Sequence, residues 1–211
     1  MLLVISGPSS VGKSRVIRAL LRQHRRYSFV LSHTSRKQRQ DEQNGKDYLF
    51  VSEKDFQAMY QSGLFLQWKT GPFGSYGTSF AQLDAANQGE QVPVLDLDSD
   101  GYAKLKGYFQ EVLGIFLLPP NHAVLWERIA NRGASRGILS LEDALVRYHC
   151  SCAGAEYAMC YDYILVNRDD TSTACQIHGI VQTALLQAQK SSLFQDWLED
   201  GVKSMVECGE S

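Results

Sequence analysis

The sequence predicts an α/β fold in which helices flank a parallel sheet and a small lobe is inserted into the chain. Three observations support this fold class. Short apolar runs without polar alternation are typical of strands buried on both faces of a parallel sheet. Segments with helical spacing alternate with these runs, as βα units require. Between residues 32 and 88 the composition becomes polar and glycine-rich, which indicates an insertion.

Length and composition exclude several classes of protein. The 211 residues suffice for one domain with its own core, and 44% hydrophobic against 21% charged residues excludes a mainly disordered chain. A formal net charge of −2 provides no overall attraction to nucleic acid or anionic lipid. We therefore expect neither a nucleic-acid nor a membrane partner. No signal peptide or long apolar run is recognisable, so we expect a cytoplasmic location, and whether the chain forms a homodimer is left open.

The central sheet is expected to begin with the apolar residues 2–6. Further buried strands are expected at 91–98, 112–117 and 163–166, the first of these starting after Pro93 because proline lacks the N–H that a ladder needs. Helical spacing predicts helices at 13–23, 102–108, 121–132 and 141–159. Ser140 is the expected N-cap of the last helix, with Asp143 completing a capping box.

The inserted segment has its own elements. After residues 48–51 we expect a helix at 52–61 that stops before Gly63, a strand at 64–69 and a glycine-rich turn at 71–77. After Gln189 an apolar stripe with helical spacing resumes. We expect it to pack on its own domain, with a partner-binding helix as the alternative. The stripe consists of Leu193, Phe194, Trp197, Leu198, Val202, Met205 and Val206.

A phosphate-binding motif lies between the first strand and the first helix. Residues 7–14 read Gly-Pro-Ser-Ser-Val-Gly-Lys-Ser and match G-x-x-x-x-G-K-[ST], the P-loop, whose backbone N–H groups and helix N-terminus cradle phosphates. Lys13 is expected to reach the β and γ phosphates of a nucleoside triphosphate, and the Ser14 hydroxyl to bind Mg²⁺. The motif alone does not decide between ATP and GTP. The candidate residues of this site are Gly7, Ser9, Ser10, Val11, Gly12, Lys13 and Ser14.

Asp96 is expected at the carboxyl end of a buried strand, where open α/β sheets bind ligands. It is a candidate for orienting the water ligands of Mg²⁺ or the Lys13 ammonium. The alternative role, capping the helix that follows, is left open.

Two arginines in the inserted segment indicate a second anion site. Arg36 and Arg39 are three residues apart, so their guanidinium groups can converge on one phosphate, and Tyr48 and Tyr76 can add hydroxyl donors. The alternative is a solvated basic stretch.

From residue 2 to about residue 184 the sequence resembles the guanylate kinases, P-loop enzymes that transfer a phosphoryl group from ATP to GMP. The resemblance rests on a linked series of motifs, specific by its order and spacing. These are residues 7–14; Ser32-x-Thr34-x-Arg36-x-x-Arg39-x-x-Glu42-x-x-Gly45-x-x-Tyr48-x-Phe50; Tyr76-Gly77-Thr78-Ser79; Asp96-Leu97-Asp98; Leu118-Pro119-Pro120; Arg132-Gly133; and Tyr161-Asp162-Tyr163-Ile164-Leu165-Val166-Asn167.

The resemblance implies a P-loop parallel sheet flanked by helices, with an inserted nucleotide-monophosphate-binding lobe and a helical lid. It implies a domain over 1–190 (core 1–31 and 89–190, GMP-binding lobe 32–88, lid 128–155), followed by an amphipathic tail at 191–211. The implied substrates are ATP with Mg²⁺ and GMP or dGMP. Arg36, Arg39, Tyr48 and Tyr76 would hold the GMP phosphate, and Ser32, Thr78 and Asp98 would read the guanine. Arg128, Arg132 and Arg147 would close over the transferred phosphoryl group, and Asn167 is a positional candidate for the adenine side of the ATP site.

One residue departs from the family pattern. The family has a glutamate before Trp68, whereas this chain has Gln67, which offers guanine's two donor groups one acceptor and one mismatched donor. We expect GMP to remain the best acceptor, because Asp98 disfavours adenine, but with weaker base selection. The alternatives are a catalytically weakened module that binds phosphorylated proteins, and a kinase for another nucleoside monophosphate or a phosphorylated sugar.

Overall fold

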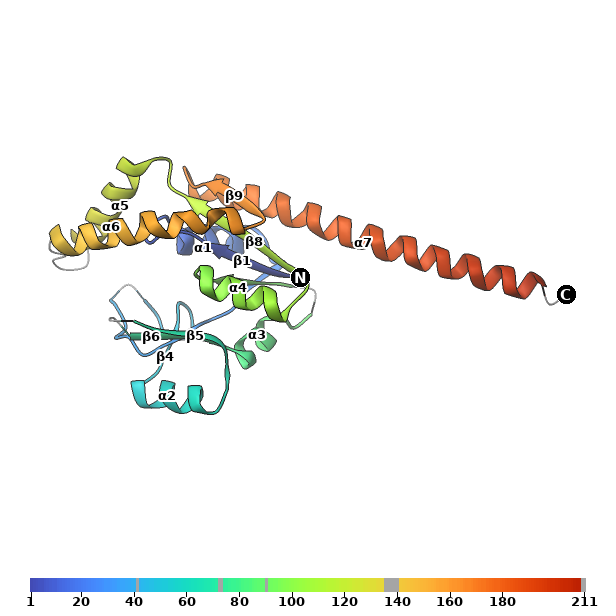
Figure 1. Cartoon of the computed structure of the whole chain (residues 1–211), viewed down its shortest axis with the longest axis horizontal. Helices are drawn as coiled ribbons and strands as arrows, with labels where there is room; N and C mark the ends of the chain where they lie inside the picture. Colours follow the sequence, from blue (N-terminus) through green and yellow to red (C-terminus); the bar gives the residue numbers. More distant parts are fainter. Residues whose placement is uncertain (41, 72–73, 90, 135–140, 210–211) are drawn as a thin grey trace.

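A computed structural model of the chain describes residues 1–40, 42–71, 74–89, 91–134 and 141–209, with side chains placed in these ranges up to 131 and from 141 to 190. Within them, two sheets organise the fold (Figure 1). The core sheet is parallel and contains β1 (Leu2–Ser6), β2 (Tyr27–Phe29), β7 (Val92–Asp96), β8 (Val112–Leu118) and β9 (Tyr163–Val166), in the order β2-β7-β1-β8-β9. The predicted α/β class with a parallel sheet is confirmed.

Helices cover both faces of the core sheet. Alternate residues of each strand point to opposite faces, so each strand contributes apolar side chains to both layers. Ile5 and Ile115 face α1 (Lys13–Gln23) and the first half of α7 (Asp170–Gly209). Val4 and Phe116 face α4 (Ser99–Tyr108) and the short 3₁₀ helix η1 (Glu156–Cys160). The two apolar layers account for the continuously apolar sequences of β1 and β8.

The second sheet lies between β2 and β7 in the sequence. Its strands are β3 (His33–Thr34), β4 (Leu49–Phe50), β5 (Phe65–Gly71) and β6 (Gly74–Ser79), with α2 (Glu53–Gln61) and α3 (Phe80–Ala86) beside them. The predicted turn at 71–77 is too long: Gly71 already pairs with Gly74, and residues 74–79 form an antiparallel strand beside β5. Glycine at position 77 serves packing rather than a turn, since a Cβ there would lie 2.8 Å from the Phe65 ring.

Helices α5 (His122–Ala134) and α6 (Leu141–Ala155) form a separate pair, packed through Leu125, Ile129 and Ala144. The helix predicted at 141–159 ends earlier, at Ala155, and continues as η1. Gly154 precedes this end, and glycine weakens a helix. The predicted N-cap, Ser140, lies outside the described residues.

Two further boundaries and the burial of one strand differ from the prediction. Strand β7 begins at Val92, before Pro93. The proline nitrogen points toward β1, and β1 and β7 pair only from Val94 onward, so the N–H that proline lacks is not needed there. Helix α4 begins at Ser99, three residues early, because the Asp98 side chain caps it. Strand β9 was expected to be buried, but it lies at the sheet edge, so Tyr163, Ile164 and Val166 are exposed.

Helix α7 is 40 residues long and reaches well beyond the sheets. Three of its buried apolar residues, Ala174, Ile177 and Val181, pack in the core cluster that includes α1. The backbone of residues 191–209 runs away from the remainder of the chain (Figure 1), which disagrees with the predicted packing of the tail on its own domain. None of the helices in the described ranges combines the length and apolar character needed to cross a membrane.

Candidate active site

The P-loop connects β1 to α1 in a conformation that depends on two of its glycines. Gly7 and Gly12 have φ values of 143° and 107°, and Ser10 is left-handed at 64°. A side chain at Gly7 would collide with the Leu117 carbonyl oxygen, and one at Gly12 would lie 2.5 Å from Asn167 Nδ2. The glycines therefore permit both the curl of the loop and its close seating on β8 and on the end of β9.

Lys13 and Asp96 meet at the carboxyl edge of the core sheet. Lys13 Nζ donates to the Gly7 carbonyl at 2.9 Å and lies 3.9 Å from Asp96 Oδ1. Asp96 ends β7 and is in register with Ile5 on β1. The helix-capping role left open for Asp96 belongs to Asp98, whose Oδ1 accepts the Gly101 N–H at 2.9 Å.

Arg128 and Asn167 hold the backbone of the P-loop in place through hydrogen bonds. Arg128 Nη1 donates to the Val11 carbonyl at 2.9 Å and Nη2 to the Asn167 carbonyl at 3.2 Å. Asn167 is buried; its Nδ2 also donates to Val11 O, at 2.9 Å, and its Oδ1 accepts the Thr173 hydroxyl at 3.1 Å. A direct contact between Asn167 and adenine would require these hydrogen bonds to break.

The other two arginines predicted to act in the lid are placed less completely. Arg147 lies half-buried on α6. The backbone of Arg132 is on α5, but its side chain lies outside the described residues.

The second anion site gathers around Arg36, on the loop after β3. Its guanidinium binds the Glu42 carboxylate with both terminal nitrogens, at 2.8 and 2.9 Å, and its Nε donates to the Tyr76 hydroxyl at 3.0 Å. Arg39 Nη1 also donates to Glu42, at 3.3 Å. The ring of Tyr48 lies 5.3 Å from the Arg36 guanidinium carbon and 6.0 Å from the ring of Tyr76. All four residues predicted to bind this phosphate are thus brought together.

Glu42 was quoted within a motif but was assigned no role from the sequence. It is buried, and although burial opposes its ionisation, hydrogen bonds from Arg36 and the Arg39 N–H lower its pKa. The ionised carboxylate orients both arginines before any ligand arrives. The sequence feature that could have identified this role of Glu42 was its position three residues after Arg39 in the motif.

A polar cluster brings together the four residues predicted to read the base. Thr78 Oγ1 shares a hydrogen bond with Ser32 Oγ and accepts one from Gln67 Nε2, both at 3.0 Å. A Cβ placed on Gly101 would lie 3.3 Å from Gln67 Oε1 and 3.4 Å from Asp98 Oδ1, so these two oxygens converge beside the start of α4. Strand β5 supplies Gln67 and the core supplies Asp98, so the cluster spans both parts of the molecule.

Two interactions link the core and the lobe near the anion sites. Arg18 on α1 forms an ion pair with Asp47 in the loop before β4. Burial raises the pKa of Tyr48 to about 12, with the negative charge of Asp96 as the next contribution. Tyr48 of the lobe therefore lies within electrostatic range of Asp96 at the edge of the core sheet.

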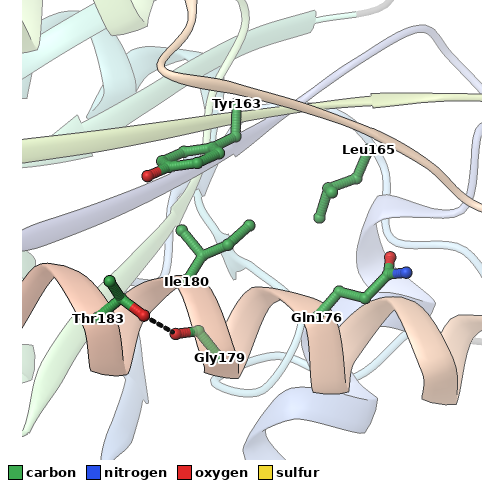
Figure 2. Close-up of a pocket in the computed structure, with 6 residues that line it drawn as sticks. All are labelled: Tyr163, Leu165, Gln176, Gly179, Ile180 and Thr183. Atoms are coloured by element: carbon green, nitrogen blue, oxygen red, sulfur yellow. Dashed lines mark hydrogen bonds between the residues drawn. The ribbon is translucent and has the colours of Figure 1, made fainter.

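A separate open pocket lies between β9 and α7, lined by Tyr163, Leu165, Gln176, Gly179, Ile180 and Thr183. Figure 2 shows Tyr163 and Leu165 directed from the strand toward the helix. The pocket contains no predicted site residue and no charged side chain. It therefore lacks the groups that either phosphate site provides.

Comparison with known proteins gives a consistent result. The sequence profile of the family described as "Guanylate kinase" matches residues 1–184. A guanylate kinase of Prochlorococcus marinus (strain MIT 9312) is 31% identical over 86% of this chain and 97% of its own length. One from Caldanaerobacter subterraneus subsp. tengcongensis is 34% identical over 86% of each chain. The crystal structure of guanylate kinase from Anaplasma phagocytophilum shares the fold, with a TM-score of 0.70 at 24% identity over 87% of this chain and 85% of that one.

Proposed function

The chain belongs to the guanylate kinase family, and from that premise we propose that it transfers a phosphoryl group from ATP to GMP, giving ADP and GDP. The residues assigned to the acceptor contact its phosphate and base, so we extend the proposal to dGMP, which lacks only a ribose hydroxyl. In this proposal the core (1–31 and 89–190) carries ATP, the lobe (32–88) carries GMP and the lid (128–155) closes over both.

The observation that carries the proposal is that the chain holds two anion sites, one on the core and one on the lobe. One is the P-loop with Lys13, and the other is the Arg36–Arg39 pair oriented by Glu42. The ion pair of Arg18 with Asp47 joins the core to the lobe, and Tyr48 lies within electrostatic range of Asp96. In this proposal, closure of the lobe and the lid brings the two sites face to face. Phosphoryl transfer needs two bound phosphates in line and little covalent participation by the protein.

The roles of the side chains follow from their charge and position. Arg36, Arg39, Tyr48 and Tyr76 bind the acceptor phosphate, whose oxygen is already an anion and needs no general base. Lys13 exchanges its contact with the Gly7 carbonyl for the phosphates of ATP. Arg132 and Arg147 supply positive charge when the lid closes and water is excluded, whereas Arg128 holds the P-loop backbone in place.

The residues at the carboxyl edge of the core sheet also fit Mg²⁺. A hydroxyl from Ser14 and a carboxylate from Asp96, the latter through water, are the oxygen ligands this ion prefers. Bound there with ATP, Mg²⁺ would neutralise charge on the phosphates. Asp96 would at the same time keep the Lys13 ammonium near the site, as its 3.9 Å separation from Nζ allows.

A coupled assay that detects ADP tests the proposal, with ATP as donor and GMP, dGMP, IMP and AMP as acceptors. We expect turnover with GMP and dGMP and the least with AMP. Lys13→Ala should lower kcat by on the order of 10²–10³, the loss typical of one removed electrostatic contact. Lys54→Ala, on the exposed face of α2, is the matched control.

Two outcomes would contradict the proposal. Binding of a phosphopeptide without turnover of any nucleotide would favour the phosphoprotein-binding alternative, which Gln67 keeps open. Efficient turnover of AMP or a sugar phosphate with none of GMP would favour the other kinases.

A further inference from the structure

Lys69 occupies a position beside the base-reading cluster for which the sequence assigned no role. It follows Gln67 by two residues on β5, so both side chains lie on the same face of the strand. Lys69 Nζ lies 3.0 Å from Asp98 Oδ2 and 3.6 Å from Asp100 Oδ2. A cation from the lobe therefore contacts the carboxylate that is expected to read guanine.

Both oxygens of Asp98 already have partners. Oδ1 accepts the Gly101 N–H, and Oδ2 accepts from Lys69. Burial opposes ionisation of Asp98, but the Gly101 N–H and the Lys69 ammonium outweigh it and lower its pKa. Asp98 is thus ionised with its charge compensated, and it presents a weaker acceptor than a free carboxylate.

Gln67 does not restore a negative charge to the cluster. Its Nε2 donates to Thr78, which leaves Oε1 as its one acceptor for a base. Guanine offers two kinds of donor on that edge, N1–H and the 2-amino group, whereas hypoxanthine offers only N1–H and shares guanine's O6. The 2-amino group consequently meets no uncompensated carboxylate.

We propose that Lys69 is a specificity-determining residue, whose charge on Asp98 reduces the advantage of the 2-amino group and broadens the acceptor class to 6-oxopurine nucleoside monophosphates. The inference rests on the proposed function and deepens it. A neutral hydrogen bond discriminates by about 2- to 12-fold, and one to an uncompensated charge by about 10- to 150-fold. The preference of the wild-type protein for GMP over IMP falls in the lower range.

The pair is suitable for mutation because it contributes little to the fold. The side chains of Lys69 and Asp98 are 61% and 49% exposed, and exposed ion pairs add little stability. Lys69→Met keeps the length of the side chain and removes its charge. Lys69→Arg keeps the charge, and Lys54→Met removes a charge from exposed α2 as a matched control.

The experiment measures kcat/KM for GMP and IMP, and their dissociation constants by calorimetry, in the wild type and the three variants. We expect Lys69→Met to raise the GMP-to-IMP ratio about tenfold, and Lys69→Arg and Lys54→Met to leave it within twofold. When Asp98→Asn is also introduced, Lys69→Met should no longer raise the GMP-to-IMP ratio, because position 98 then carries no negative charge for Lys69 to compensate.

A ratio in Lys69→Met within twofold of wild type would overturn the role of Lys69. So would a wild-type preference above about 12-fold, or an equal rise in Lys69→Arg. If the wild type turns over GMP in any of these cases, the proposed function stands and only the inference fails. Absence of GMP turnover in the wild type would overturn the proposed function, while the calorimetric ratio still decides the role of Lys69.

Discussion

At the scale of single residues, the buried Glu42 determines how the acceptor phosphate site is built. Two arginines close to one another repel, and Glu42 compensates their charge through hydrogen bonds to Arg36 and Arg39. Because Arg36 and Glu42 are both almost fully buried, removal of either leaves an unpaired charge and is strongly destabilising. Arg39 is more exposed, which makes it the better residue for a test of binding.

We predict that Arg39→Ala weakens GMP binding by about 10- to 100-fold, since hydrogen bonds to a charged group are lost, and changes ATP binding by less than about twofold. Calorimetric titration of each nucleotide measures both constants. Lys37→Ala, at the neighbouring exposed cation, should leave both constants near wild type. An equal loss of both affinities in Arg39→Ala would show that Arg39 acts on the fold rather than on the acceptor.

We also predict that Gln67→Glu raises kcat/KM for GMP by about 10- to 150-fold. The carboxylate accepts from guanine donors, and the Thr78 hydroxyl can rotate to donate where it now accepts from Gln67. Steady-state kinetics of the variant give the value, with Gln88→Glu as an exposed control of equal charge change. An unchanged or lower value would remove Gln67 from the base-reading cluster.

At the scale of elements, the contact between α1 and α7 contains a pair of histidines. The ring of His24, the C-cap of α1, stacks on that of His178 at 3.6 Å, and the Tyr27 hydroxyl lies 2.9 Å from His178 Nδ1. Burial lowers the pKa of His178, and the positive charges of His24 and Arg26 add to this effect. The folded protein therefore protonates His178 at a lower pH than the unfolded chain does.

The sign of the pH dependence follows from that difference. Below the ordinary histidine pKa of 6.5 the unfolded chain binds more protons at this position than the folded one, so stability is lost as pH falls. We predict a lower melting temperature at pH 5.5 than at pH 7.5, and a smaller difference in His178→Gln. His33, whose pKa burial also lowers, contributes the slope that remains. The same slope in the variant and the wild type would exclude His178 as a cause.

The base-reading cluster also depends on elements rather than on isolated residues. Strand β5 carries Gln67 and Lys69, while the N-terminus of α4 carries Asp98. The Lys69–Asp98 pair can therefore form only when the lobe and the core are held together. Movement of the lobe would change the compensation of Asp98 along with access to the site.

At the scale of the whole molecule, helix α7 continues well beyond the part that is seen to pack on the core. Among its side chains described up to residue 190, Leu185 is the last in the core cluster, whereas the helix backbone continues to Gly209. We predict that a chain ending at Lys190 keeps kcat within about twofold and its melting temperature within about 2 °C, the range of changes made at exposed sites. Thermal unfolding and the coupled assay provide the two measurements.

A large drop in stability of the shortened chain would show that residues after 190 pack on the domain, as the sequence predicted. Size-exclusion chromatography of both forms, at several concentrations, tests whether the projecting segment joins two copies. A dimer that becomes a monomer on truncation would assign the apolar stripe to self-association.

The sequence by itself determined the features that short stretches of chain encode. The P-loop of residues 7–14 requires left-handed glycines in a fixed order. Helix α2 ends before Gly63 as expected, whereas Ser52, expected as its first residue, is its N-cap. Apolar strands alternating with helices were enough for the parallel sheet. Only the tertiary structure decided that 74–79 form a strand, that β9 is an exposed edge, that Glu42 joins the arginines and that Lys69 reaches Asp98. The physical reason is that backbone sterics and capping act within a few residues, whereas strand register, edge position and ion pairs between distant segments depend on how the whole chain packs.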